Sequence, residues 1–240
     1  MTTNLPAIRA KALAELAQKA RTRLATTGMG ISADIVASSG KPRLIFAMDA
    51  TYSRSRAWES ASQITADMLC ETPDNLEVQL VYFQGNTFTS EKFTDNVGKL
   101  ADAISGVKCE AGYTKLTELA SHAVEEAGKG KLRSIIFIGD SFEESLDGMM
   151  ADLGRLRALG VRIFIFAEGD DREARSNFEQ MAKATDGMVF DFDSSAVGKV
   201  RDILRGISLL SSGGVQALQA AAKRLPGAAL LLAHVSGAKA

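Results

Sequence analysis

The sequence contains few of the residues on which specialised small domains depend. Among 240 residues there are two cysteines, two histidines and four prolines. Cys70 and Cys109 are too few for a disulfide framework, and they lack the CxxC spacing of zinc and redox sites, so we expect two reduced thiols. A chain of this length buries about three-quarters of its unfolded surface and needs neither disulfides nor structural metal to fold.

The chain also lacks a large charge excess and a long apolar run. Its 28 Lys and Arg residues against 29 Asp and Glu residues give a net charge of −1, which argues against a nucleic-acid-binding protein. The longest apolar stretch, residues 227–235, is far shorter than the roughly 20 residues of a membrane span. Charged residues interrupt the N-terminal segment, so no secretory signal is expected. We therefore expect a soluble, cytoplasmic protein that neither spans a membrane nor binds nucleic acid, and its oligomeric state stays open.

What the sequence does contain is a regular alternation of short apolar runs with segments of helical periodicity. This alternation predicts a doubly wound α/β fold, with a mostly parallel sheet, one antiparallel edge strand and helices on both faces. Strands are predicted at residues 44–48, 78–83, 87–89, 135–138, 161–166 and 188–192. Helices are predicted at residues 58–69, 93–104, 116–127, 146–159, 173–185 and 197–210.

The alternation divides the chain into one α/β domain, residues 42–210, with an extension at each end. Residues 1–41 contain an Ala-rich basic helix and a linker, and the helix either packs on the domain or docks on an acidic partner. Residues 211–240 form a helical, apolar extension, with a helix at 217–225 that ends at Pro226. This extension covers either the sheet edge or a partner.

Polar residues follow the apolar strands at the places where each strand ends. In open α/β sheets, ligands bind beyond the carboxyl ends of the strands. Asp49, Thr51 and Ser53 follow the first strand at intervals of two, Asp140 follows a neighbouring strand, and Thr114 lies in a loop between two helices. Two carboxylates and three hydroxyls, without His or Cys, suit a hard ion such as Mg²⁺, with Mn²⁺ and Ca²⁺ as alternatives. The other interpretation is that the Asp residues only cap the helices that follow them.

This pattern resembles the metal-ion-dependent adhesion site (MIDAS) of von Willebrand factor type A (VWA) domains. That family has DxSxS after the first strand, a Thr between the second and third helices, and an Asp after the fourth strand. The order of elements over residues 42–210 is also similar to that of single-domain bacterial members. The resemblance implies a Rossmann-like VWA fold with a metal site. In that site, hydroxyl oxygens would come from Thr51, Ser53 and Thr114. The carboxylates of Asp49 and Asp140 would bind the ion directly or through water.

The sequence departs from the family pattern at two positions. Thr51 stands where the family usually has Ser, and Gly139 stands before Asp140 where the family commonly has Thr. The carboxylate and the hydroxyls are kept, so these departures bear on the choice and affinity of the metal more than on the existence of the site.

A divalent ion held by two carboxylates still attracts an incoming anion. We therefore expect a metal-dependent binding module, in which an Asp or Glu of a partner protein completes the coordination of the ion. Tyr52, Tyr113 and Phe142 lie near these loops in the sequence, and Tyr is frequent among the residues that dominate binding energy at interfaces.

Two other functions stay open. A metal-dependent phosphatase or hydrolase would use Asp49 as nucleophile and Asp140 as metal ligand. Asp49 is similar to the strand-end Asp of haloacid-dehalogenase-type phosphatases, but Thr51 stands in place of their second Asp, the general acid. No nucleotide-binding motif occurs, and we expect His122 and His234 to be structural, so we expect no enzyme. The third candidate is a scaffold domain with a degenerate site.

Overall fold

The computed structural model describes residues 40–51, 74–192 and 196–237. Five predictions lie outside this part of the chain: the basic helix in residues 1–41, the helix at residues 58–69, Ser53 with its proposed role at the metal site, Tyr52 beside the interface, and the reduced thiol of Cys70. Within the described residues, no helix combines the length and the apolar character needed to cross a membrane.

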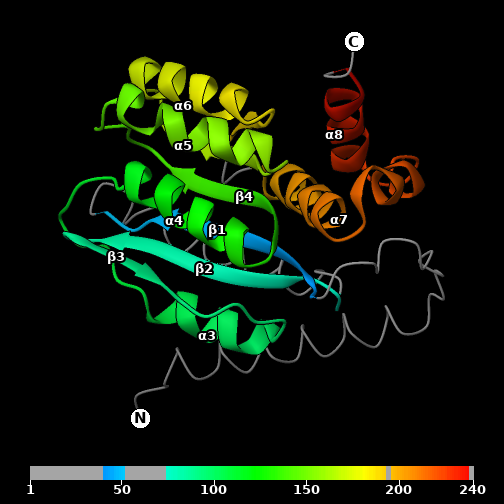
Figure 1. Cartoon of the computed structure of the whole chain (residues 1–240), viewed down its shortest axis with the longest axis horizontal. Helices are drawn as coiled ribbons and strands as arrows, with labels where there is room; N and C mark the ends of the chain where they lie inside the picture. Colours follow the sequence, from blue (N-terminus) through cyan, green and yellow to red (C-terminus); the bar gives the residue numbers. More distant parts are fainter. Residues whose placement is uncertain (1–39, 52–73, 193–195, 238–240) are drawn as a thin grey trace.

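The described strands form one sheet in the order β3-β2-β1-β4-β5-β6 (Figure 1). Strand β3 is antiparallel to β2, and the other neighbouring pairs are parallel. This arrangement confirms the predicted fold class. The strands are β1 (Pro42–Asp49), β2 (Glu77–Gln84), β3 (Thr87–Ser90), β4 (Lys131–Gly139), β5 (Arg162–Ala167) and β6 (Met188–Asp191).

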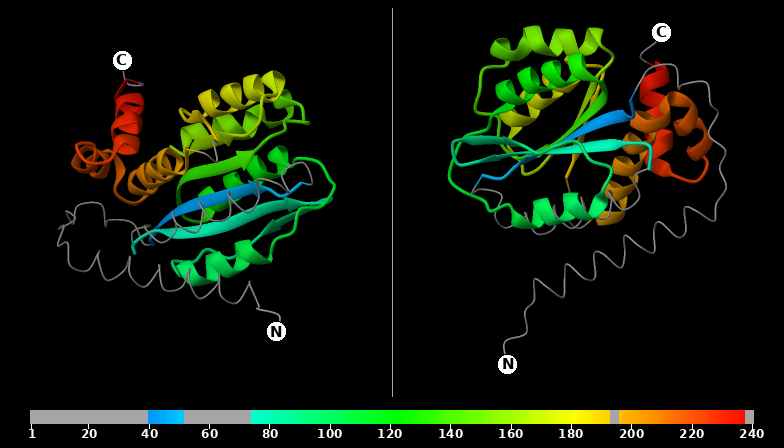
Figure 2. Two further views of the ribbon diagram at one scale, coloured as in Figure 1. Left: turned by 180° about the vertical axis from the view of Figure 1, so that it is seen from behind. Right: turned by 60° about the horizontal axis from the view of Figure 1, so that its bottom comes forward.

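Helices cover both faces of the sheet, as predicted (Figures 1 and 2). One face carries α4 (Leu116–Lys129), α5 (Leu146–Ala158) and α6 (Arg172–Ala184). The other carries α3 (Val97–Gly106) and α7 (Val197–Ala221), and α8 (Pro226–Gly237) packs on α7. The side chains of β1 alternate between the two cores, because successive residues of a strand point to opposite faces: Leu44, Phe46 and Met48 lie in one, Ile45 and Ala47 in the other.

Helix α3 begins four residues later than the predicted helix at 93–104. Thr94 instead forms a short antiparallel bridge with Val78, through N–H···O=C bonds of 2.9 and 3.0 Å. The side chain of Asn96 then accepts a hydrogen bond from the backbone N–H of Lys99 and caps the helix. The prediction was wrong at this boundary because the bridge pairs residues that lie 16 positions apart.

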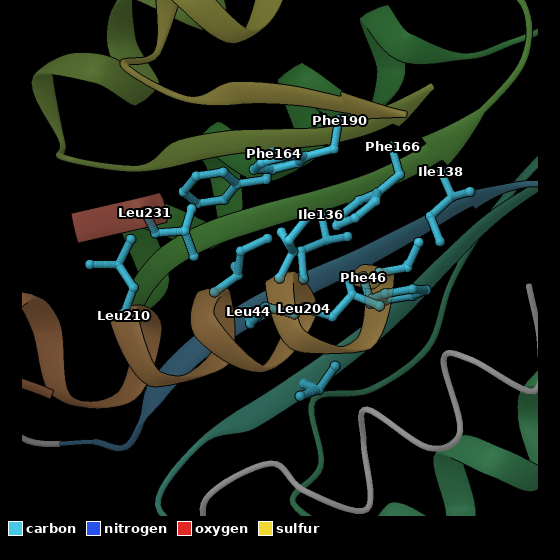
Figure 3. Close-up of a cluster of buried hydrophobic side chains, with 14 of the residues drawn as sticks. Leu44, Phe46, Ile136, Ile138, Phe164, Phe166, Phe190, Leu204, Leu210 and Leu231 are labelled. Carbon is cyan, nitrogen blue, oxygen red and sulfur yellow. The ribbon is translucent and has the colours of Figure 1, made fainter. Parts of the chain in front are cut away.

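The C-terminal extension belongs to the hydrophobic core. Helix α7 continues past residue 210 to Ala221, with a break at Gly214, where φ is 66°. Pro226 begins α8, which corrects the prediction that it ends a helix; proline suits the first turn, where its missing N–H leaves no hydrogen bond unmade. Leu231 is fully buried in the core cluster that α7 forms with the sheet (Figure 3).

Helices α7 and α8 approach closely because both have glycine at the contact. A Cβ on Gly206 would lie 2.8 Å from Leu231 Cδ1, and a Cβ on Gly227 would lie 2.1 Å from the carbonyl oxygen of Asp202. His234 of α8 also lies 3.2 Å, through Nε2, from the carbonyl oxygen of Asp186 in the turn before β6. The extension is thus held by apolar packing and by a polar contact between α8 and the turn before β6.

Candidate metal centre

Asp49 is the last residue of β1 and is fully buried. Its Oδ1 accepts a hydrogen bond of 2.8 Å from the backbone N–H of Thr51, which is also buried. The register of β1 and β4 pairs Met48 with Ile138, so Asp49 lies beside Gly139 and Asp140 follows one residue later. The two predicted carboxylates therefore leave neighbouring strands at the same edge of the sheet.

Gly139 has no space for a side chain. A Cβ at this position would lie 2.4 Å from the Phe137 ring and 3.4 Å from Asp49 Cβ. Phe137 is itself fully buried and packs against Phe83 and Phe178. The departure from Thr at position 139 is thus a packing requirement of this core, and it leaves Asp140 in place.

The loop that carries Thr114 is attached to the end of β1 by backbone pairing. Glu110 forms a parallel bridge with Thr51, and its N–H donates a 3.1 Å hydrogen bond to the carbonyl oxygen of Ala50. Two residues later, a Cβ on Gly112 would lie 1.8 Å from the carbonyl oxygen of Gly85, in the turn between β2 and β3. Only glycine fits this close approach, and it fixes the path of the loop up to Thr114.

Thr114 is buried and is bound to the loop that follows β4. Its backbone N–H donates a 3.0 Å hydrogen bond to Glu143 Oε2, and its Oγ1 accepts a 3.3 Å hydrogen bond from the backbone N–H of Glu143. Glu144 continues this attachment, because its carboxylate accepts hydrogen bonds from the N–H groups of Leu116 and Thr117, the first two residues of α4. The loop of Thr114 and the loop of Asp140 thus form one hydrogen-bonded unit.

Asp140 is partly buried and borders a pocket of about 380 Å³. The pocket lies at the start of α6 and at the ends of β5 and β6, where Asp171 caps α6 by accepting hydrogen bonds from two backbone N–H groups. Arg175, which lines the pocket, forms ion pairs with Glu179 and Asp191. The lining contains six carboxylates and two guanidinium groups: Asp140, Glu168, Asp170, Asp171, Glu179 and Asp191, then Arg172 and Arg175.

Four of the five predicted site residues thus lie at one edge of the sheet: Asp49, Thr51, Thr114 and Asp140. Ser53 lies outside the described residues. In the part of the chain that the structure describes, no three His, Cys, Asp or Glu side chains converge as a metal cluster. The predicted donor set contains only two carboxylates, so it is a different kind of site, completed by hydroxyls and water.

The chemistry of the described donors fits a hard divalent ion. Asp49 is 0% exposed, and the two threonines are 6% and 3% exposed. Burying an ionised carboxylate costs free energy that a nearby cation offsets. Oxygen donors from a carboxylate and from hydroxyls are also the ligands that Mg²⁺, Mn²⁺ and Ca²⁺ prefer.

Sequence reasoning assigned no role to Glu143 and Glu144. Their hydrogen-bond partners lie 27 to 29 positions earlier in the chain, so no local capping pattern predicts a role for the two glutamates. The only available signal was the presence of two consecutive carboxylates in a loop that follows a buried strand.

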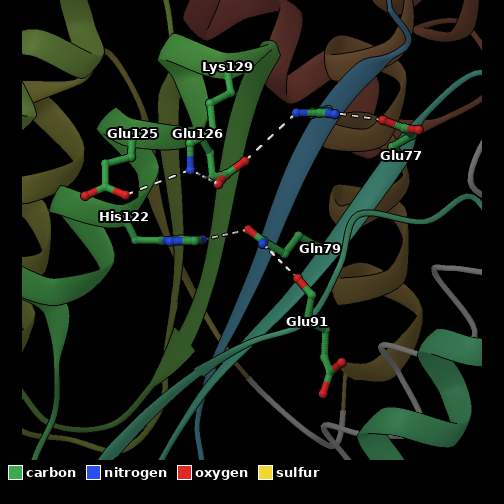
Figure 4. A network of polar contacts seen from close by, with 8 residues as sticks. Glu77, Gln79, Glu91, His122, Glu125, Glu126 and Lys129 are labelled. Carbon is green, nitrogen blue, oxygen red and sulfur yellow. Dashed lines mark hydrogen bonds and ion pairs between the residues drawn. The ribbon is translucent and has the colours of Figure 1, made fainter.

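His122 is part of a polar network away from this edge (Figure 4). Its Nε2 lies 2.8 Å from Oε1 of Gln79, whose amide nitrogen donates a 2.8 Å hydrogen bond to the carbonyl oxygen of Glu91. Burial lowers the pKa of His122, and the neighbouring Glu126 acts in the opposite direction. The contacts of His122 thus join α4 to β2 and to the segment after β3.

Comparison with known proteins identifies the fold. The sequence matches no family model and no curated protein. Solved structures match over most of the chain. A von Willebrand factor type A protein from Catenulispora acidiphila has a TM-score of 0.58 and 13% identity, over 72% of this chain and 44% of its own. The VWA domain of SpRpn10 has a TM-score of 0.55 and 12% identity, over 68% and 94%.

A third solved structure is proximal thread matrix protein 1 from the mussel byssus, with a zinc-occupied MIDAS motif. Its TM-score is 0.57 and its identity 18%, over 70% of this chain and 46% of that protein. The chain thus spans less than half the length of two of these three proteins. At these identities the matches establish the fold, and the fold is VWA-like.

Proposed function

We propose that this protein is a divalent-metal-dependent binding module, in which Mg²⁺ held at the sheet edge is completed by an Asp or Glu of a partner protein. The observation that carries the proposal is the buried Asp49 at the end of β1, with Thr51 beside it and with the loops of Thr114 and Asp140 attached to the same edge. The zinc-occupied MIDAS of the mussel protein supports a metal site on this fold.

Ser53 and Thr51 would supply hydroxyl oxygens, Thr114 a third, and Asp49 and Asp140 would bind directly or through water. The ion would supply positive charge at an edge that is otherwise acidic. The six carboxylates of the neighbouring pocket exceed its two guanidinium groups, so without the ion this edge repels an acidic partner. Binding of an acidic partner therefore depends on the metal.

An exposed aromatic side chain adjoins the proposed site. Tyr113 precedes Thr114 and is 68% exposed, which is unusual for a large side chain with an apolar ring. Tyr contributes strongly to interfaces because it combines a large rigid surface with a hydroxyl group. We propose that Tyr113 packs against the partner beside the ion. Phe142, which was also predicted to frame the interface, is half-buried and packs against Phe178 of α6.

The metal part of the proposal is tested by calorimetric titration of Mg²⁺ and Mn²⁺ into the wild type and Asp49→Ala. We expect binding to the wild type and none to the variant. Absent binding in both proteins, or equal binding in both, would refute the metal site.

The partner part is tested by selecting displayed random peptides in Mg²⁺ and eluting them with chelator. We expect the selected peptides to share an Asp or Glu whose change to Asn or Gln removes binding. Peptides that stay bound in chelator, or that bind Asp49→Ala equally well, would show that the ion is not the contact.

We propose binding without catalysis, in a cytoplasmic setting. The contacts of His122 support the absence of catalysis, because its ring is engaged with Gln79, away from the sheet edge. A screen of generic phosphate esters with Mg²⁺ tests it: turnover that Asp49→Asn abolishes would replace the binding module with a metal-dependent phosphatase.

A further inference from the structure

The loops of Thr114 and Asp140 come from segments far apart in the sequence, yet they are joined by reciprocal hydrogen bonds. The backbone N–H of Thr114 donates to the side chain of Glu143, and the backbone N–H of Glu143 donates to the side chain of Thr114. Each residue therefore supplies one backbone donor and one side-chain acceptor. Such a pair fixes both the separation of the two loops and the rotamer of the Thr114 side chain.

Glu144 secures the same junction at the start of α4. The residue before this helix, Lys115, provides no side-chain cap, so the first N–H groups of α4 need acceptors from elsewhere. Glu144 supplies them to Leu116 and Thr117. Its negative charge also suits the positive end of the helix dipole. The loop after β4 is thus anchored to α4 as well as to Thr114.

We propose that Glu143 and Glu144 are positioning residues of the metal site, which hold Thr114 and Asp140 in one rigid unit before a metal ion binds. This inference rests on the proposed function, since it assigns the two carboxylates a role toward the same ion. Neither residue is proposed as a ligand. Their contribution is that the ion does not have to order two separate loops.

The hydrogen bonding of Thr114 is compatible with this role. A threonine hydroxyl has two acceptor lone pairs and one proton. One lone pair accepts the N–H of Glu143, at 3.3 Å. The second lone pair is available to a metal ion, and the bond to Glu143 restricts the directions in which it points. Residues that orient a metal ligand in this way typically change metal affinity by about 10- to 100-fold when they are removed.

The test is calorimetric titration of Mg²⁺ into the wild type, Glu143→Ala, Glu143→Gln, Glu144→Ala and Glu144→Gln. Glu143 is exposed and Glu144 is only partly buried, so these variants are expected to fold. We expect the two alanine variants to bind Mg²⁺ about 10- to 100-fold more weakly. We also expect faster amide exchange at Thr114, Leu116 and Thr117 in their metal-free forms, because these N–H groups lose their acceptors.

The glutamine variants give a graded rescue that a general loss of stability would not give. Glu143 uses one oxygen, Oε2, toward Thr114, and a glutamine retains one oxygen, so Glu143→Gln recovers most of the affinity. Glu144 uses both oxygens toward α4, so Glu144→Gln recovers only part of it. The matched control is Asn96→Ala, which removes the side-chain cap of α3 and is expected to leave Mg²⁺ affinity unchanged.

The outcomes separate the inference from the proposed function. Wild-type affinity in both alanine variants would overturn the positioning role while leaving the metal site intact. Weakening of the same size in Asn96→Ala would also overturn it, because the effect would then follow from helix stability alone. Absence of Mg²⁺ binding in the wild type would overturn the proposed metal function and the inference with it.

Discussion

Replacing Leu231 by alanine tests whether α8 is part of the core. The side chain is 0% exposed and lies at the glycine-lined contact between α7 and α8. The change removes three carbon atoms, worth roughly 2.4 kcal/mol of transfer free energy. A residual cavity adds to this, so we expect a loss of about 3 kcal/mol in the free energy of unfolding. For a chain of this size that loss lowers Tm by roughly 6 to 12 °C.

The adjacent residue provides a matched control. Leu230 belongs to the same helix and is 42% exposed, so Leu230→Ala changes the helix propensity in the same way and removes much less buried surface. We expect Leu230→Ala to cost less than about 1 kcal/mol, measured for both variants by urea and thermal unfolding. Equal losses in the two variants, or no loss in either, would refute the assignment of α8 to the core. The extension would then be free to serve a partner.

Three other predictions concern the site and its surroundings. Mg²⁺ at 100 times its Kd is expected to stabilise the wild type by about 2.7 kcal/mol, measured as a rise in Tm. Asp49→Asn keeps an acceptor for the N–H of Thr51 and should show no rise in Tm. A rise in both proteins would contradict the assignment of Asp49 to the metal site. Burial lowers the pKa of His122 below its ordinary value of 6.5, so the contribution of His122 to the unfolding free energy is expected to be constant above about pH 6.5 and to fall below it, as the unfolded state takes up the proton first. His122→Gln should flatten this part of the decline in urea titrations at pH 5 to 8. Gly112→Ala is expected to weaken Mg²⁺ binding and lower Tm, because the added Cβ would overlap the backbone carbonyl of Gly85. The control Gly148→Ala lies in open space within α5 and should raise stability by up to about 1 kcal/mol. Similar changes in Tm in both variants would show that the close approach of Gly112 to Gly85 does not matter.

The sheet was predictable because the pattern that marks each parallel strand lies within the strand's own residues. The parallel strands contain runs of apolar residues, as expected for strands that are covered on both faces, and the helices between them show a clear period. The predicted strand at 44–48 lies inside β1, and the predicted strand at 161–166 is shifted by one residue from β5. The predicted start of α3 was wrong because a long-range contact decides it: Thr94 pairs with Val78. The prediction at Pro226 was wrong for a local reason, since proline can begin a helix as well as end one.

The candidate site also has a part that the sequence predicts and a part that depends on long-range contacts. The positions of Asp49 and Asp140 follow from the ends of apolar strands, so the sequence was sufficient to predict that they share an edge. The position of Thr114 depends on the pairing of Glu110 with Thr51, just after β1, and on hydrogen bonds to Glu143. Both contacts join residues that lie 29 or more positions apart. A sequence pattern can identify Thr114 as a candidate, but only the fold shows which contacts fix its position.

The near-neutral net charge of the chain conceals a strongly uneven distribution at this edge. A charge of −1 over 240 residues argued against nucleic acid as a partner and favoured no other class. Yet Asp49 is buried at the end of β1, and Asp140 borders a pocket with three times as many carboxylates as guanidinium groups. Charges a few ångströms apart interact far more strongly than those across the molecule, which salt screens within about 8 Å. We therefore expect the local excess of carboxylates to oppose the binding of acidic groups, and a divalent ion at this edge would offset part of that excess and offer an acidic group a direct contact.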